Sequence, residues 1–124
     1  MTEHPHQLEV VDAGLRGAPG VAIRGEIDIA AVPDLELALD TAIRDSAGAF
    51  VLDLSGVGFL DSTGLRLILR ARAMLARDER GLAIVCPPGP VRRLFEVVGI
   101  ADLLFLYATR EEAAAALVPV NGRD

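Results

Sequence analysis

The feature that most constrains the fold is a short apolar run in the middle of the chain, Phe50–Leu54, which a single aspartate interrupts. A nearly continuous apolar strand is typical of a parallel sheet that is covered on both faces, whereas a half-covered strand alternates apolar and polar residues. Segments with helical spacing stand on both sides of this run, from Pro33 to the residue before Gly48 and from Asp61 to about Arg80. This alternation predicts an α/β fold with parallel central strands.

The rest of the chain continues the alternation. A turn rich in glycine and proline joins the first two expected strands, which predicts an antiparallel hairpin. The expected strands are Leu8–Ala13, Val21–Ile29, Phe50–Leu54, Leu82–Cys86 and Leu103–Tyr107, and the expected helices are 33–47, 61–80, Val91–Val98 and Arg110–Leu117. We expect a loop at Ser55–Leu60. The predicted fold class is α/β, with a mixed, mostly parallel sheet of about five strands and about four helices.

Size and composition fit one globular domain. The chain has 124 residues, of which 52% are hydrophobic and 24% are charged, enough for one sizeable core. We expect this domain at residues 8–118, with a flexible N-terminal tail at 1–7 and a C-terminal tail at 119–124.

The charges exclude several classes of function. Asp and Glu outnumber Lys and Arg by 18 to 12, and the formal net charge of −6 argues against direct nucleic-acid binding. All 12 of these basic residues are arginine. Without lysine the chain has no Walker-type phosphate loop, no Schiff-base amine and no Ser–Lys dyad. A protein or a small molecule is the more consistent partner.

Cysteine usage and apolar stretches predict a cytoplasmic protein. Cys86 is the single cysteine, so no intrachain disulfide is possible. Met1–Gln7 is polar and lacks the apolar core of a signal peptide. The longest apolar stretch, Val97–Ala108, is interrupted by Gly99 and Asp102 and is too short to span a bilayer. We therefore expect no membrane partner.

The residues Asp61, Ser62, Thr63 and Gly64 stand where the expected loop meets the long helix. Asp or Ser at this position caps a helix by accepting backbone N–H groups of the first turn, and capping alone explains the motif. A second interpretation is functional, because an exposed hydroxyl at the positive end of a helix suits Ser62 to carry a phosphate. Position alone does not decide between the two.

A serine hydrolase matches these residues poorly. A nucleophile elbow has glycine two residues before and two residues after the serine; Gly64 fulfils one position, but Leu60 occupies the other. A serine nucleophile also needs a base, and the only imidazoles are those of His4 and His6 in the N-terminal tail. Two histidines in a tail also make a poor metal site. We expect no enzyme activity, no catalytic residues, no metal and no cofactor.

The second expected strand carries two carboxylates on its polar face. Glu26 and Asp28 lie two residues apart and therefore point the same way in a strand. Such a pair is consistent with acid–base chemistry, with a solvated strand face or with an acidic recognition patch. The opposite, apolar face of this strand is expected to carry Val21, Ile23, Ile27 and Ile29.

Arginines dominate the charged residues of the long helix. Arg66, Arg70 and Arg77 share one side of it, which is the usual pattern of a solvated helix face. Arg72 falls within the apolar arc instead, and the pattern does not explain its presence.

Three motifs in order connect the chain with a known family. They are Gly25-Glu26-Ile27-Asp28, then Val51–Leu54 followed by Phe59–Leu65, and finally Val91–Gly99. From about Leu8 to Leu117, the chain resembles the anti-sigma factor antagonists, the stand-alone STAS domains of bacteria. In that family, the serine after the motif aspartate is phosphorylated by an anti-sigma factor that is also a kinase. The matching serine here is Ser62.

The resemblance implies a partner switch. The unphosphorylated protein would bind the anti-sigma factor and free a sigma factor; phosphorylation of Ser62 would break this complex, and a separate phosphatase would restore it. We expect helix N–H groups to hold the phosphate, and the protein to be a monomer or a weak dimer. The residues expected to bind the partner are Glu26, Asp28, Asp61, Ser62, Thr63, Gly64 and Arg66.

Two alternatives remain open from the sequence. A STAS protein without a switch would serve as scaffold of a signalling assembly or as soluble accessory of a membrane transporter. The other alternative is an enzyme, and turnover of a substrate by the isolated protein would support it.

Overall fold

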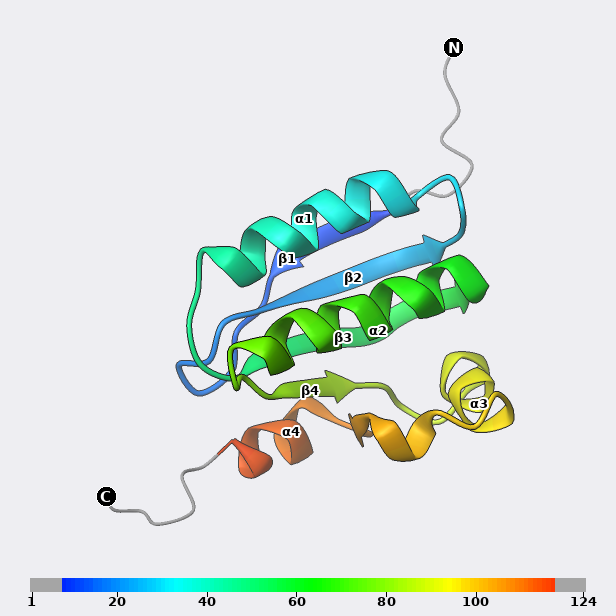
Figure 1. The fold of residues 1–124 in the computed structure, drawn as a ribbon. Helices are drawn as coiled ribbons and strands as arrows, with labels where there is room; N and C mark the ends of the chain where they lie inside the picture. Colours follow the sequence, from blue (N-terminus) through cyan, green and yellow to red (C-terminus); the bar gives the residue numbers. More distant parts are fainter. Residues whose placement is uncertain (1–7, 118–124) are drawn as a thin grey trace.

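The described part of the chain, residues 8–117 of a computed structural model, is built around a five-stranded sheet in the order β1-β2-β3-β4-β5 (Figure 1). The strands are β1 (Glu9–Asp12), β2 (Gly20–Ile27), β3 (Phe50–Leu60), β4 (Leu82–Val85) and β5 (Phe105–Tyr107). The helices are α1 (Val32–Arg44), α2 (Ser62–Arg77), α3 (Pro90–Val97) and α4 (Arg110–Ala116), with a turn of 3-10 helix, η1, at Ala101–Leu103. The expected tails at 1–7 and 119–124 lie outside the described residues.

The strand directions confirm the predicted fold class. β1 pairs antiparallel with β2, and the pairs β2–β3, β3–β4 and β4–β5 are parallel. The sheet is therefore mixed and mostly parallel, with the expected hairpin at its start. No helix of the described part has the length and apolar character needed to cross a membrane.

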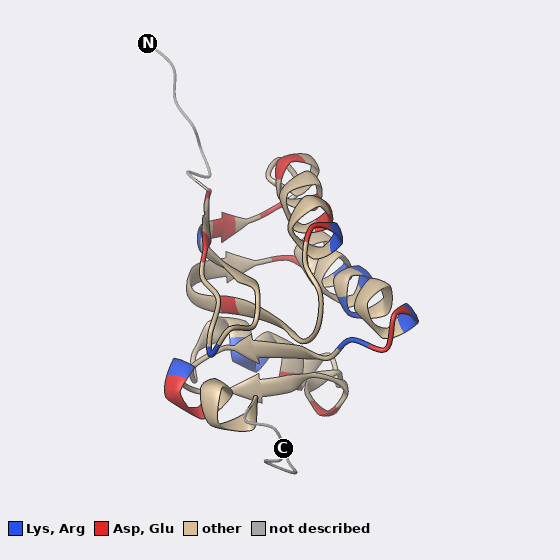
Figure 2. Cartoon of the chain, turned by 90° about the vertical axis from the view of Figure 1, so that its left-hand side faces the viewer, with Lys and Arg blue, Asp and Glu red and all other residues tan. Residues whose placement is uncertain are grey.

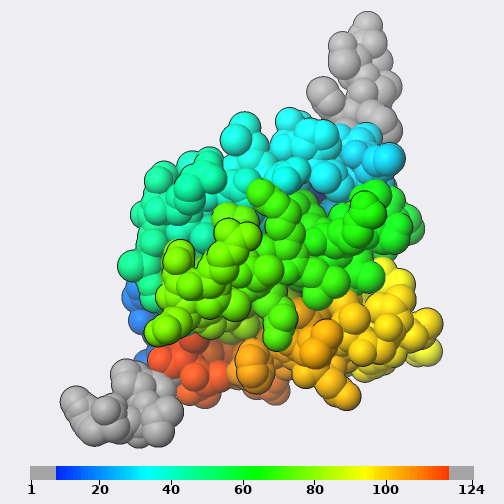
Figure 3. All heavy atoms as spheres, viewed as in Figure 1, coloured from blue at the N-terminus to red at the C-terminus, as the bar shows by residue number. Residues whose placement is uncertain are grey.

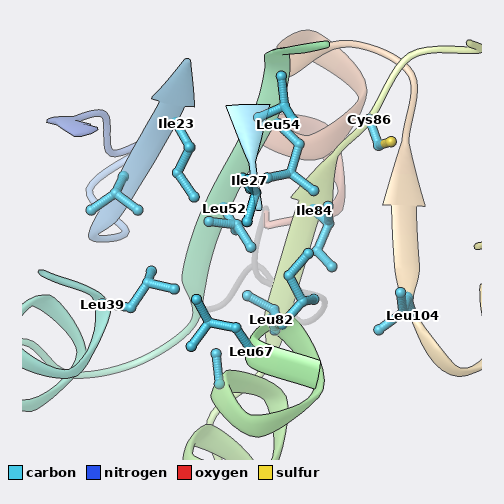
Figure 4. Close-up of a cluster of buried hydrophobic side chains, with 14 of the residues drawn as sticks. Ile23, Ile27, Leu39, Leu52, Leu54, Leu67, Leu82, Ile84, Cys86 and Leu104 are labelled. Carbon is cyan, nitrogen blue, oxygen red and sulfur yellow. The ribbon is translucent and has the colours of Figure 1, made fainter. Parts of the chain in front are cut away.

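Helices α1 and α2 lie side by side on one face of the sheet and form the main core with it (Figures 1 and 3). Figure 4 shows Ile23, Leu52 and Ile84 of three neighbouring strands gathered in this core with Leu39 of α1 and Leu67 of α2. These side chains come from the apolar face of each strand and helix. The period of two in the strands and the helical period of about 3.6 therefore place them in the same core.

Helix α4 covers the opposite face, over β4 and β5. Val51, Val85 and Ala113 are buried there in a second, smaller cluster. Because alternate residues of a strand face opposite sides of a sheet, Val51 belongs to this cluster whereas Leu52 belongs to the main core. All five residues of Phe50–Leu54 are buried, which explains why this part of β3 has no polar alternation.

Asp53 is the one charged residue of this buried run, and it is 5% exposed. Its carboxylate accepts hydrogen bonds from the Ser55 N–H (2.9 Å), the Ser55 hydroxyl (2.6 Å) and the Arg110 guanidinium (3.0 Å). Burial alone would raise the pKa of Asp53, but the hydrogen bonds from Ser55 and Arg110 outweigh it and hold the pKa below its ordinary value. Arg110 also donates to the Gly14 carbonyl at 3.2 Å. This ionised pair fastens α4 to the centre of the sheet.

The expected loop at Ser55–Leu60 is wrong. These residues continue β3, which pairs with β2 as far as Ile27 beside Leu60. Its two glycines lie in an irregular part of the ladder that contains register shifts. A side chain at Gly56 would meet the Cγ atom of Arg24 at 2.8 Å, so the close approach of the two strands requires glycine there.

Other boundaries differ by a few residues. β2 ends at Ile27, and Ile29, which we expected on the apolar face, is 72% exposed. α2 ends at Arg77 and not near Arg80, because Glu79 adopts a left-handed conformation (φ 57°) that a helix cannot contain. The expected last strand, Leu103–Tyr107, begins two residues later than predicted, because Leu103 belongs to η1 and β5 starts at Phe105.

Arg72, which the sequence pattern did not explain, is exposed on the flank of α2. It lines a hollow of about 160 Å³ together with Leu103 and Phe105. On its side towards β5, the apolar face of α2 is therefore narrower than the sequence pattern suggested, because it does not include Arg72.

The buried ion pair gives the first prediction. Replacing Arg110 by methionine leaves the Asp53 carboxylate buried without its cation, which destabilises a fold far more than losing a surface pair. Arg110 is 39% exposed, so we expect a loss of about 2–3 kcal/mol in the free energy of unfolding, somewhat below the range for fully buried pairs. Urea denaturation measures this loss.

Arg24→Met is the matched control. Arg24 pairs with Glu9 at 3.4 Å, and both side chains are 58% exposed. We expect this substitution to change the free energy of unfolding by less than about 1 kcal/mol. Equal losses for the two variants would show that Arg110 does not anchor α4.

Candidate functional site

The carboxyl ends of β2 and β3 meet at one rim of the sheet, where α1 and α2 also begin (Figure 1). Ile27 pairs with Leu60, and the Asp61 N–H donates to the Ile27 carbonyl at 3.2 Å. The residues that follow the two strands, Asp28 and Asp61, are therefore brought to the same rim. This is the place where parallel α/β sheets usually carry their binding residues.

Asp61 is the N-cap of α2. Its Oδ1 atom accepts hydrogen bonds from the Thr63 N–H at 3.0 Å, from the Gly64 N–H at 3.2 Å and from the Thr63 hydroxyl. The hydrogen bond from the Thr63 hydroxyl contributes most to lowering the pKa of Asp61, and the bonds from the two backbone N–H groups contribute less. Together they hold this pKa below its ordinary value. Asp61 is therefore a carboxylate at neutral pH. The capping interpretation of this motif is confirmed for Asp61.

The same hydrogen bonds narrow the expectation that helix N–H groups hold a phosphate. The N–H groups of Thr63 and Gly64 donate to the Asp61 side chain, and the Leu65 N–H donates to the Asp61 carbonyl. A phosphate on Ser62 would have to displace a carboxylate to reach the first two donors. Of the first N–H groups of α2, only that of Ser62 itself has no acceptor among the described residues.

Ser62 is the first residue of α2 and is exposed. Its hydroxyl takes part in none of the side-chain hydrogen bonds that the described residues form. Thr63 differs in both respects, because it is half-buried and its hydroxyl donates to Asp61. Of the two adjacent hydroxyls, Ser62 is thus the one open to another protein.

Gly64 is buried where the first turn of α2 lies against the end of β2. A Cβ atom at this position would meet the Cγ2 atom of Ile27 at 2.6 Å and the Cγ atom of Leu60 at 3.1 Å. Glycine is therefore required for the helix to begin so close to the strand.

The structure separates the two carboxylates that the sequence grouped together. Glu26 is exposed and lies on the face of the sheet opposite to Ile27, away from α1 and α2. Asp28 follows the end of β2 and is half-buried, not fully exposed; its Oδ1 atom accepts a hydrogen bond from the Ala31 N–H at 3.1 Å. Strand periodicity does not extend to Asp28, which instead stabilises the turn into α1.

A groove of about 390 Å³ runs between the first turns of α1 and α2. Its lining residues are Ile29, Val32, Pro33, Glu36, Thr63, Arg66, Leu67 and Arg70. Ile29 stands 72% exposed beside it. Sequence reasoning missed this groove, because the alternation of β2 placed Ile29 in the core and nothing in the sequence marks where that strand ends.

The charges of the two helices differ in sign. α1 carries acidic residues and α2 carries arginine but no Asp or Glu (Figure 2). Arg70 holds the two helices together through a two-point hydrogen bond with Asp40 (2.8 and 3.1 Å) and an ion pair with Glu36 (3.1 Å). Arg66, one turn earlier, has no ion-pair partner among the described residues.

Other chemistry finds little support at this rim. No group of three His, Cys, Asp or Glu side chains within residues 8–117 is placed to hold a metal ion. Cys86 is buried, and desolvation raises the pKa of its thiol to about 11, so it is not a reactive thiolate. The rim offers an exposed hydroxyl, a capping carboxylate, a groove and a free guanidinium.

The sequence profile of the STAS domain matches residues 13–113 of the chain. The chain belongs to the STAS domain family. The match includes every candidate residue from Glu26 to Arg66. It also includes the anchor pair of Asp53 and Arg110.

Named relatives agree with this assignment. An anti-sigma-B factor antagonist of Staphylococcus aureus is 33% identical over 84 residues, which cover 68% of this chain and 78% of that protein. The crystal structure of an anti-sigma factor antagonist from Mycobacterium paratuberculosis covers 95% of this chain and 100% of its own, with a TM-score of 0.85 and 30% identity. The anti-sigma factor antagonist SpoIIAA in its unphosphorylated form covers 87% of this chain and 95% of its own, with a TM-score of 0.70 and 26% identity.

The contact of Gly64 with β2 gives the second prediction for this STAS domain. Gly64→Ala forces the new methyl group against Ile27, and overpacking of this kind costs about 1–3 kcal/mol. The intrinsic gain of alanine in a helix offsets at most about 1 kcal/mol of that. We therefore expect a net loss of stability in thermal or urea unfolding. Ile27→Leu removes the offending Cγ2 atom, and we expect it to restore part of the loss in the double variant.

Gly58→Ala is the control for this prediction, because a Cβ atom at Gly58 would meet nothing within 4 Å. We expect that variant to unfold within about 0.5 kcal/mol of the wild type. A stable Gly64→Ala variant would mean that α2 begins further from β2 than the structure shows.

Proposed function

We propose that this STAS domain is an anti-sigma factor antagonist. Its unphosphorylated form binds an anti-sigma factor that is also a serine kinase, and thereby releases a sigma factor. Phosphorylation of Ser62 switches this binding off, and a phosphatase that acts on phospho-Ser62 restores it. The observation that carries the proposal is the exposed, unbonded hydroxyl of Ser62 on the first turn of α2, next to an apolar groove.

The relatives support the first part of this proposal, that the protein is an anti-sigma factor antagonist. Proteins from Staphylococcus aureus and Mycobacterium paratuberculosis are both named as antagonists of anti-sigma factors. SpoIIAA is named as such an antagonist in its unphosphorylated form, which makes phosphorylation a variable of that protein. Ser62 occupies the position that the family motif assigns to the phosphorylated serine.

Electrostatics support the second part of the proposal, that phosphorylation of Ser62 switches the binding off. A phosphoserine carries a charge of about −1.5 to −2 at neutral pH. It would stand next to Asp61, which is itself ionised because the pKa of its carboxyl is lowered by its hydrogen bonds to α2. A partner packed against this rim would meet a new, hydrated, anionic group. A loss of only about 1.4 kcal/mol in association is already a tenfold weaker complex.

The fold itself is expected to survive the modification. Ser62 is exposed, and the bonds that begin α2 are made by Asp61, Thr63 and Gly64. The protein is on this proposal the substrate of a kinase and a phosphatase, and not an enzyme. We propose that it works in the cytoplasm, as a monomer or weak dimer, through protein partners and without nucleic acid, membrane or cofactor.

Mapping the phosphate tests the site. The protein is incubated with its cognate kinase and ATP, and the modified residue is identified by mass spectrometry. We expect phosphate on Ser62 and none in Ser62→Ala, which should unfold like the wild type and bind the anti-sigma factor constitutively. Ser62→Asp should bind at least about tenfold more weakly.

Modification only at Thr63 or Ser55 would overturn the assignment of Ser62. Binding of the partner without any phosphate transfer would instead favour a STAS scaffold that does not switch. Of Thr63 and Ser55, Thr63 is the more informative comparison with Ser62. It is adjacent to Ser62 in the sequence, but its hydroxyl is bonded to Asp61.

Two variants of Asp28 separate its charge from its hydrogen bond. Asp28→Asn keeps an oxygen that accepts from the Ala31 N–H, whereas Asp28→Ala loses it. We expect the asparagine variant to unfold within about 0.5 kcal/mol of the wild type, and the alanine variant to lose about 0.5–2 kcal/mol, the range for capping residues.

If the charge of Asp28 contributes to recognition, both variants lose affinity for the anti-sigma factor, measured by titration calorimetry at a temperature where both are folded. Full affinity of Asp28→Asn, together with a lower melting temperature of Asp28→Ala, would make Asp28 purely structural.

A further inference from the structure

A phosphate on Ser62 needs a counter-charge, and the start of α2 carries no full positive charge and has only the Ser62 N–H without an acceptor among the described residues. The Thr63 and Gly64 N–H groups both donate to the Asp61 carboxylate, and Leu65 donates to the Asp61 carbonyl. The carboxylate that occupies these donors is also negative and directly adjacent to Ser62. The Ser62 N–H is uncharged, so a full counter-charge must come from a side chain.

Arg66 is the side chain that the helix brings to Ser62. The two residues are four apart in α2, both are exposed, and side chains at this spacing are neighbours on a helix surface. Arg66 has no ion-pair partner among the described residues, whereas Arg70 is held by Asp40 and Glu36. Arg66 can move to a new anion without breaking an existing pair.

We propose that Arg66 is the counter-ion of the phosphate on Ser62, and that phosphorylation in this way draws Arg66 out of the groove between α1 and α2. The inference rests on the proposed phosphorylation of Ser62. A guanidinium binds two phosphate oxygens in parallel, which makes this pair stronger than a carboxylate pair at the same spacing.

The pairing adds a second effect to the switch. In the unphosphorylated protein, Arg66 lines the groove as its unpaired cation, beside the apolar surface of Ile29 and Leu67. An acidic side chain of the partner would find its counter-charge there. Once Arg66 is bound to the phosphate, the groove keeps its apolar lining and loses this charge. The modification then repels the partner and also removes one of its contacts.

The test is the pKa of the phosphate itself, followed by phosphorus NMR over a pH titration. Phosphoserine is placed at position 62 during synthesis of the full chain, so the measurement does not depend on any kinase. The charged groups around this end of the sheet (Figure 1) are Glu26 and Asp28 at the end of β2, Asp34, Glu36 and Asp40 of α1, Asp61, Arg66 and Arg70 at α2, and Arg92, Arg93 and Glu96 of α3. Variants of Arg66 are compared with variants of other arginines.

We expect Arg66→Gln to raise the phosphate pKa by about 0.3 pH unit or more, because a nearby cation favours the dianion and its loss disfavours it. Arg66→Lys should retain most of the lowering, since it keeps the charge. Arg77→Gln, in the last turn of the same helix, makes the same change of net charge far from Ser62 and should shift the pKa by less than about 0.1 unit.

A phosphate pKa that is the same in Arg66→Gln and Arg77→Gln would overturn the inference. A larger rise in Arg93→Gln than in Arg66→Gln would also overturn it, by assigning the counter-ion to α3. Neither outcome bears on whether a kinase modifies Ser62. Conversely, failure of a kinase to modify Ser62 would overturn the proposed function. It would not change the pairing of Arg66 with the phosphate that the NMR titration measures.

Discussion

The hydrogen bonds of Asp61 are the interaction on which the candidate site depends. One carboxylate oxygen accepts from the Thr63 N–H, the Gly64 N–H and the Thr63 hydroxyl, so it fixes the point at which β3 becomes α2. These bonds tie down Thr63 and leave the Ser62 side chain as the free hydroxyl of the turn. They also keep Asp61 ionised and use two of the backbone donors that a bound anion would otherwise find at a helix start.

Close packing of two neighbouring strands then decides what surrounds Ser62. Because β2 and β3 are parallel and end together, the helices that follow them start side by side and enclose a groove. Gly64 allows α2 to begin directly against Ile27, and the Arg70 pair with Asp40 joins the two helices further along. The opposite face of the sheet has a separate anchor in Asp53 and Arg110. The groove and the anchor pair thus lie on different faces of the sheet.

The sequence was sufficient for the fold class and for the capping motif, because both depend on local patterns. The buried run Phe50–Leu54 indicated a sheet covered on both faces, and Asp61 indicated a helix start. It was insufficient where a contact joins distant segments. We expected a loop at Ser55–Leu60, although pairing with β2 makes this stretch a strand.

The groove and the anchor pair were missed for the same reason. Strand alternation placed Ile29 in the core because the point where β2 ends is set by the turn into α1, which Asp28 stabilises. The pair of Asp53 and Arg110 joins residues 57 positions apart, and no periodicity reports such a contact. That the Thr63 and Gly64 N–H groups beside Ser62 are already bonded also became visible only when the partners of Asp61 were known.

The division of roles between Asp61 and Ser62 would allow the proposed phosphorylation of Ser62 to change binding without unfolding the domain. Serine is itself a good capping residue, but a phosphorylated cap would lose the geometry that begins its helix. Here aspartate is the cap, and the serine stands one residue later, where its hydroxyl contributes none of the bonds that hold the turn. The charge of the rim can therefore change while the start of α2 stays in place. What changes is the surface that a partner meets.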